Sequence, residues 1–148
     1  MKIIRLSPHA KLPVKASEGA AGFDLFASER TVVPATVVRD GRADIGHALV
    51  ATGIAISLPS GHVGRIGSRS GLSTRDNIEV GAGWIDADYR GEIKVELKNF
   101  SSRDFVVEEG ARIAHLIVLP IASPELELTD SLPPSSRGSG GLGSTGLK

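Results

Sequence analysis

The segment EIKVELKN, from Glu92 to Asn99, is the clearest structural signal in the chain. Its apolar residues Ile93, Val95 and Leu97 alternate with charged ones along the whole segment. Successive side chains of a β-strand point to opposite faces, so this period of two predicts a strand with one buried face and one polar face. A helix of this length would need apolar residues three or four apart instead.

Similar signals continue on both sides of this segment and favour β structure throughout. RIAHLIVLP (112–120) is a continuous apolar run, suited to a strand buried on both faces, and ELELT (125–129) alternates again. Turn-forming residues separate the runs, and SGLSTRD (70–76) is the one stretch suited to a helical turn. We therefore expect an all-β sandwich or jelly roll. The remaining strand-like runs are IIRL (3–6), FDLFA (23–27), TVVPATVV (31–38), ALVATGIAISL (48–58) and HVGRI (62–66).

The composition excludes several classes of function. The 148 residues carry 17 basic and 17 acidic side chains, and this balance argues against electrostatic binding to nucleic acid or to an anionic membrane. Aromatic residues make up only 4% of the chain, so a base-stacking platform is not expected. The chain has no cysteine, which excludes disulfides and thiol catalysis. No signal peptide or membrane-spanning run is recognised, so the expected location is the cytoplasm.

The last part of the chain differs from the rest. Residues 131–148 are rich in Gly, Ser and Pro, so we divide the chain into a β domain (1–130) and a tail that is mobile in the free protein. Within the tail, Gly141, Gly143 and Gly146 spell G-x-G-x-x-G, but only two residues follow. Because no helix can follow, a dinucleotide-binding turn is excluded. A flexible end with an arginine, hydroxyls and free amides can instead order around an anion.

Two stretches inside the β domain could carry chemistry. GRIGSRSGLS (64–73) brings Arg65, Arg69 and Ser70 to a strand end, where they suit either phosphate oxygens or pairing with surface carboxylates. VGAGWIDADYRGEIKV (80–95) has the pattern of a hairpin with Asp86 and Tyr89 near its tip. Its carboxylates could be a metal pair or an ordinary Asp-rich turn.

Some residues in and beyond these stretches have a simpler interpretation when taken alone. Trp84 is more often a core residue than a ligand contact, and His115 in an apolar strand is more often packed and hydrogen-bonded. The four histidines are scattered along the chain and predict no metal cluster.

Five stretches, in order along the chain, resemble the motifs of the trimeric dUTPase family (deoxyuridine triphosphate nucleotidohydrolases). The resemblance implies a jelly-roll-like β-sandwich protomer, a homotrimer with active sites shared between subunits, and a mobile C-terminal arm. It implies hydrolysis of dUTP to dUMP and pyrophosphate, with Mg²⁺ held mainly by substrate phosphates and water. The five stretches are AGFDLFAS (21–28), GRIGSRSGLS (64–73), GWIDADYRGEIKVELKN (83–99), GARIAHLIV (110–118) and RGSGGLGSTG (137–146).

The same resemblance implies a role for each candidate residue. Asp86 matches the general base that activates the attacking water, and Tyr89 matches the ring that packs under deoxyribose. Asp24 matches a supporting acid, with a contact to Mg²⁺ through water as one option. The other substrate-binding candidates are Arg69, Ser70 and Gly71 for the phosphates, the backbone of Gly83, Trp84 and Ile85 with Lys94 for uracil, His115, and Arg137, Gly138, Ser139, Leu142, Gly143 and Ser144 of the tail.

The chain departs from the family pattern at several positions. Gly67-Ser68 stands where the family usually has Ala-Pro, which is expected to loosen the turn of the second motif. His115 stands in place of a usual Gln and adds titration near neutral pH, and Leu142 stands in place of a usual Phe. Other hypotheses are a dCTP deaminase-like enzyme, a non-catalytic dUTPase-like regulator and a plain β-sandwich binding module. Asp86, Tyr89 and the tail favour dUTP hydrolysis over the deaminase. An intact Asp86 disfavours the regulator, and the five ordered motifs disfavour the binding module.

Overall fold

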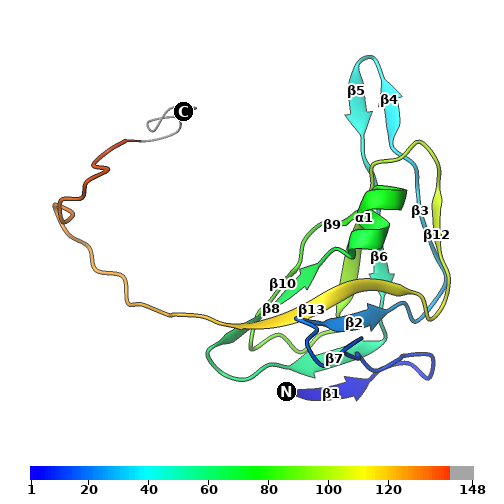
Figure 1. The fold of residues 1–148 in the computed structure, drawn as a ribbon, viewed down its shortest axis with the longest axis horizontal. Helices are drawn as coiled ribbons and strands as arrows, with labels where there is room; N and C mark the ends of the chain where they lie inside the picture. Colours follow the sequence, from blue (N-terminus) through cyan, green and yellow to red (C-terminus); the bar gives the residue numbers. More distant parts are fainter. Residues whose placement is uncertain (141–148) are drawn as a thin grey trace.

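The structure is a computed structural model that describes residues 1–140, and it is built mostly of β-strands with one short helix (Figure 1). All strand pairs are antiparallel. This confirms the prediction of a β protein with a single helical turn. The elements are β1 (Lys2–Arg5), β2 (Phe23–Phe26), β3 (Thr31–Val33), β4 (Val37–Arg39), β5 (Arg42–Asp44), β6 (Gly46–Ala51), β7 (Ile54–Ser57), β8 (His62–Gly67), α1 (Ser70–Asp76), β9 (Ile78–Val80), β10 (Trp84–Ile85), β11 (Lys94–Asn99), β12 (Phe105–Val107) and β13 (Arg112–Pro120).

Two sheets enclose the hydrophobic core. One has the strand order β10-β8-β13-β2 and the other has the order β6-β11-β9. Leu25, Ile66 and Leu116 of the first sheet and Val95 and Leu97 of the second belong to one cluster of buried side chains. Because both sheets contribute to the same cluster, each covers one side of the core. The smaller pairs are β1–β7, β12–β3 and β4–β5.

The strongest sequence patterns predicted their elements well. β11 buries Val95 and Leu97 and leaves the charged residues between them outside the core, as the alternation predicted. β13 and α1 have the bounds predicted for them. The helix ends because Asn77 adopts a left-handed conformation, with φ at 54°, and its N–H bonds back to the last turn.

Two structural predictions were wrong. ELELT forms no strand, and Leu126 and Leu128 are 100% and 101% exposed. Alternation alone does not make a strand, because the backbone needs a neighbouring strand to pair with. The predicted hairpin is also absent: β10 pairs with β8, whereas β11 pairs with β6 and β9, so residues 86–93 connect the two sheets.

The compact part of the protein ends shortly after β13. The N–H of Ile121 donates to the carbonyl of Gly61 at 2.9 Å, and residues 122–139 are exposed. Figure 1 shows this segment running away from the β domain. The proposed domain boundary at 130 stays a prediction, and the tail candidates Leu142, Gly143 and Ser144 lie outside the described residues. Within residues 1–140, no helix is long and apolar enough to cross a membrane.

Candidate active site

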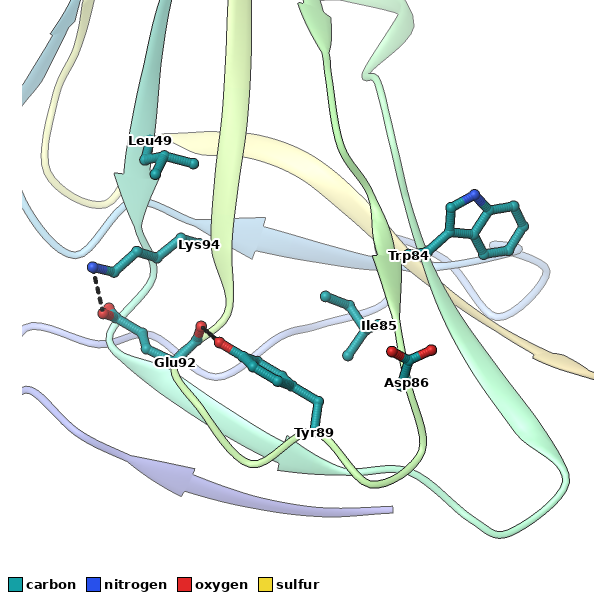
Figure 2. Close-up of a pocket in the computed structure, with 7 residues that line it drawn as sticks. All are labelled: Leu49, Trp84, Ile85, Asp86, Tyr89, Glu92 and Lys94. Carbon is teal, nitrogen blue, oxygen red and sulfur yellow. Dashed lines mark hydrogen bonds and ion pairs between the residues drawn. The ribbon is translucent and has the colours of Figure 1, made fainter.

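A pocket of about 490 Å³ opens where the chain passes from one sheet to the other. Its walls come from the end of β10, the connection to β11 and the edge of β6 (Figure 2). Five of the predicted site residues line this pocket: Trp84, Ile85, Asp86, Tyr89 and Lys94. The complete lining is Leu49, Trp84, Ile85, Asp86, Tyr89, Glu92 and Lys94.

Asp86 presents an exposed carboxylate at this pocket. It follows the last residue of β10, and its backbone carbonyl accepts a hydrogen bond from the N–H of Tyr89 at 3.1 Å. This bond fixes the turn, while the exposed carboxylate makes no hydrogen bond or ion pair within residues 1–140. A carboxylate held in this way is available to accept a proton from a water molecule.

The ring of Tyr89 is held in place by the connection that follows it. Its hydroxyl donates to the backbone carbonyl of Glu92 at 3.0 Å. A side chain at Gly91 would come within 2.6 Å of the ring carbon that bears the hydroxyl, so only glycine leaves room for this ring position. The ring is 44% exposed, so one side of it is available to a ligand.

Glu92 lies at the pocket but was missed by the sequence analysis. One carboxylate oxygen accepts from the N–H of Gly53 at 2.9 Å, and the other lies 3.7 Å from the ammonium of Lys94. Glu92 therefore fixes the position of Lys94 and connects the pocket to the turn between β6 and β7. The alternation in EIKVELKN marks Glu92 only as a polar strand residue, so the sequence held no signal for this role.

The backbone of β10 closes one side of the pocket. The carbonyl of Gly83 accepts from the N–H of Ile66 at 2.7 Å, and a Cβ at Gly83 would lie 2.6 Å from the carbonyl oxygen of Ile66. Glycine at this position therefore allows β10 to approach β8 closely. Since β10 is the outermost strand of its sheet, its other edge has backbone groups that no strand of the described chain pairs.

The expectation that Trp84 packs in the core was wrong. Trp84 is 63% exposed, and Figure 2 shows its ring pointing away from Asp86 and Tyr89. The guanidinium of Arg65, which is opposite Trp84 in the β10–β8 ladder, lies 5.0 Å from the ring centre. Strand alternation explains this orientation, because Ile85 is the neighbour that faces inward.

A second group of predicted residues surrounds Asp24, which is only 2% exposed. One of its carboxylate oxygens lies 3.3 Å from Nδ1 of His115 and 3.7 Å from Nε of Arg69. The other lies 3.3 Å from Nη1 of Arg112. Arg69 also donates from Nη1 to the carbonyl of Arg112 at 3.0 Å. A buried carboxylate thus holds the guanidinium of Arg69 beside Ser70 and Gly71, which begin α1.

Arg112 is a further residue that the sequence analysis missed. The β13–β2 pairing shifts register between Arg112 and Ala114, so that Arg112 lies opposite Phe26 and His115 opposite Asp24. Asp24 and Phe26 point to one face of β2, and this irregularity brings Arg112 and His115 to that same face. Strict period-two alternation would have placed them on opposite faces, so the pattern concealed the contact.

The pocket and the Asp24 cluster are separate within one protomer. Arg69, Ser70, Gly71 and His115 do not line the pocket. Asp24 and His115 point to the face of their sheet opposite to Leu25 and Leu116, which are in the core. Arg137 is exposed in the tail, where its Nε donates to the carbonyl of Gly140 at 3.1 Å. One described protomer therefore does not bring all the candidate residues into one cavity.

Comparisons with known proteins show the class to which the chain belongs, a nucleotide-hydrolysing enzyme with a β fold. The dUTPase family model matches residues 8–146. The deoxyuridine 5'-triphosphate nucleotidohydrolase of Solanum lycopersicum is 49% identical over 146 residues, which cover 99% of this chain and 81% of that protein. The chain therefore belongs to the dUTPase family and is a dUTP diphosphatase, as the resemblance of its motifs predicted.

Solved structures show the same fold. The dUTPase of Staphylococcus bacteriophage 80alpha with dUPNHPP matches with a TM-score of 0.86 and 28% identity, over 99% of this chain and 98% of that one. A dUTPase from phage phi11 of S. aureus, described with a structural Mg(II) ion, matches with a TM-score of 0.78 and 26% identity, over 88% and 96%. The protein therefore has a dUTPase-like fold.

Proposed function

We propose that this dUTP diphosphatase acts as a homotrimer of jelly-roll-like protomers in which each active site is shared between subunits. The observation that carries the proposal is the separation, within one protomer, of the pocket at Asp86 from the cluster that holds Arg69. Both groups suit one nucleoside triphosphate: the pocket suits its nucleoside, and the cluster suits its phosphates. A neighbouring subunit can supply the group that is missing from each pocket.

Asp86 is the proposed general base. It accepts a proton from a water molecule as the water oxygen forms a bond to the α-phosphorus of dUTP. The bond from that phosphorus to the bridging oxygen breaks, so that dUMP and pyrophosphate are the products. Phosphoryl transfer depends mainly on positioning and charge stabilisation. The fixed turn positions the carboxylate of Asp86, and the basic groups proposed for the phosphates supply the charge stabilisation. In a cell, this reaction limits uracil in DNA and provides dUMP for dTMP synthesis.

The open edge of β10 is the proposed reader of uracil. The pairing edge of uracil presents acceptor, donor and acceptor, which backbone N–H and C=O groups near Gly83 and Ile85 can match. Cytosine presents a different pattern at two of these positions.

The proposed phosphate site comprises Arg69, Ser70 and Gly71, with the tail as its cover. Asp24 is nearly buried and surrounded by basic groups, so holding Arg69 is the role that its contacts support best. Nε and Nη1 of Arg69 face Asp24 and the carbonyl of Arg112, so Nη2 carries the donors that these two contacts leave for phosphate oxygens. From the tail, Arg137, Gly138 and Ser139, together with Leu142, Gly143 and Ser144 beyond the described residues, are proposed to close over the nucleotide.

The described residues fit Mg²⁺ carried by the substrate. No group of three or more His, Cys, Asp or Glu side chains within residues 1–140 is arranged to hold a metal ion. Mg²⁺ commonly keeps several waters and binds to substrate phosphates, where it neutralises negative charge. The carboxylate of Asp24 already faces Arg69 and Arg112, so a contact to the ion through water is the weaker of its two proposed roles.

Replacing Tyr89 with Ala should weaken dUTP turnover and raise the relative rate of UTP hydrolysis, because the ring no longer occupies the space of a 2′-hydroxyl. Tyr89→Phe is the matched control, since it keeps the ring and loses only the hydrogen bond to Glu92. The ratio of kcat/KM for dUTP and UTP measures the effect. Equal rates for the two nucleotides in the wild-type protein would refute the role of Tyr89.

Replacing His115 with Phe should lower activity and alter the pH–rate profile, because the contact with the carboxylate of Asp24 is lost. His115→Gln can keep a hydrogen bond to Asp24 through its side-chain amide. We expect Gln to restore activity. Identical profiles for the wild type and both variants would show that His115 has no part in the reaction.

One experiment tests the proposed function as a whole. The protein is incubated with Mg²⁺ and each common nucleoside triphosphate in turn, and pyrophosphate release is measured beside the mass of the assembly in solution. We expect release from dUTP alone and the mass of a trimer. A monomer with full activity would contradict the shared site.

The expected cytoplasmic location stays a prediction from the sequence.

A further inference from the structure

The turn between β8 and α1 is held by hydrogen bonds at a place where the sequence predicted a loose turn. Gly67 is the last residue of β8 and Ser68 begins the turn, and a Cβ placed at Gly67 would have no atom within 4 Å. Packing at Gly67 therefore does little to fix the turn. Instead, the side-chain oxygen of Ser68 accepts from the N–H of Val80 at 2.8 Å, which attaches the turn to β9.

Glu79 on β9 connects the same turn to the helix. The hydroxyl of Ser73, in α1, donates to the carboxylate of Glu79. Hydrogen bonds from Ser68 and then Ser73 lower the pKa of Glu79 below its usual value, against a smaller opposing effect of burial. A serine hydroxyl can donate one hydrogen bond while it accepts another, so Ser68 can serve Val80 and Glu79 together. We call Ser68, Ser73 and Glu79 the serine–glutamate clamp.

In the sequence, Ser68 and Ser73 of the clamp lie on either side of the proposed phosphate-binding residues. Ser68 directly precedes Arg69, and Ser73 follows Ser70 and Gly71 in the same short helix. Glu79 lies on a strand whose position is fixed by pairing with β11, where it is opposite Lys98. The helix has no side-chain hydrogen bond capping its N-terminus, so its own sequence does not fix its start.

We propose that Glu79, through Ser68 and Ser73, is a positioning residue for the phosphate-binding segment 69–71. Asp24 holds the guanidinium of Arg69 from one side, and the clamp holds the backbone of the segment from the other. The proposal rests on the proposed phosphate-binding role of this segment. It assigns Glu79 no contact with the substrate, so its effect reaches the phosphates through Arg69, Ser70 and Gly71.

The test compares Glu79→Gln and Ser68→Ala with the wild type. We expect kcat/KM for dUTP to fall by about tenfold, because small displacements of positioned groups can cost up to roughly 10²-fold. Inhibition by inorganic pyrophosphate, which probes the phosphate site alone, should weaken. Inhibition by deoxyuridine, which probes the pocket alone, should stay unchanged. Ser68→Thr keeps the hydroxyl and should retain activity, and Glu18→Gln, on an exposed residue, is the charge control.

Several outcomes would overturn the proposal. One is unchanged kcat/KM in both Glu79→Gln and Ser68→Ala. Another is equal weakening of deoxyuridine and pyrophosphate inhibition, which would indicate general destabilisation. A third is a double variant, with Glu79→Gln and Ser68→Ala together, whose fold-loss of kcat/KM equals the product of the two single losses. That result would show that the two residues act independently. Arg69→Ala tests the phosphate-binding role of residues 69–71 separately from the positioning role of Glu79. If this variant leaves pyrophosphate inhibition intact, the phosphate site itself is wrongly assigned.

Discussion

Asp86→Asn should reduce the turnover of dUTP by about 10²–10⁴-fold, which is the usual loss when a general base is removed. The amide has nearly the shape of the carboxylate but cannot take a proton from the attacking water. Because the carboxylate of Asp86 makes no hydrogen bond or ion pair within residues 1–140, its replacement should leave the fold and the pocket unchanged. Affinity for dUTP should therefore stay close to that of the wild type.

Single-turnover rates and equilibrium binding of dUTP measure these two quantities separately. Asp88→Asn is the matched control, since Asp88 is exposed on the same connection but does not line the pocket. We expect it to keep nearly full activity. Turnover in Asp86→Asn within a few-fold of the wild type would show that another group takes the proton.

Truncation before Arg137 should lower kcat strongly and affinity much less. Ordering a flexible tail costs roughly 1–2 kcal/mol per residue in backbone entropy, so interactions with the triphosphate must offset that cost. Their largest contribution comes as charge shifts in the transition state. Arg137, Ser139 and Ser144 with the backbone amides of the tail are the expected donors, and Leu142 is expected to cover the base.

The melting temperature gives the control for this truncation. Residues 122–139 are exposed, and β13 ends before them, so the β domain should unfold at the same temperature with and without the tail. The truncated protein should also form an assembly with the same number of subunits as the wild type. A truncated protein with unchanged kcat would show that the tail does not act as a lid.

The sequence predicted the elements whose patterns are local. The alternation around Val95 and Leu97 and the apolar run of β13 reflect burial on one or two sheet faces, and the short range Ser70–Asp76 contains the only helix of the described chain. The pocket residues Asp86, Tyr89 and Lys94 also lie together, because the connection between β10 and β11 is short and fixed at both ends.

Features that depend on distant parts of the chain could not be predicted. Pairing of β10 with β8 is decided by the close contact of Gly83 with Ile66, which no local pattern reveals. Arg112 reaches Asp24 only through a shift of register. The turn at Ser68 was expected to be loose because Gly67-Ser68 replaces a usual Ala-Pro. The hydrogen bond that Ser68 accepts comes from Val80 on β9, after the helix, so no local pattern reveals it.

The most direct test of the shared site mixes two inactive proteins. One carries Asp86→Asn with an intact tail, and the other has an intact Asp86 but ends before Arg137. If base and tail come from different subunits, mixed assemblies contain some sites with both parts intact, and dUTP hydrolysis should return as subunits exchange. If the masses of mixed assemblies demonstrate exchange and no activity returns, the shared-site account is wrong. Each tail would then serve its own subunit or no site.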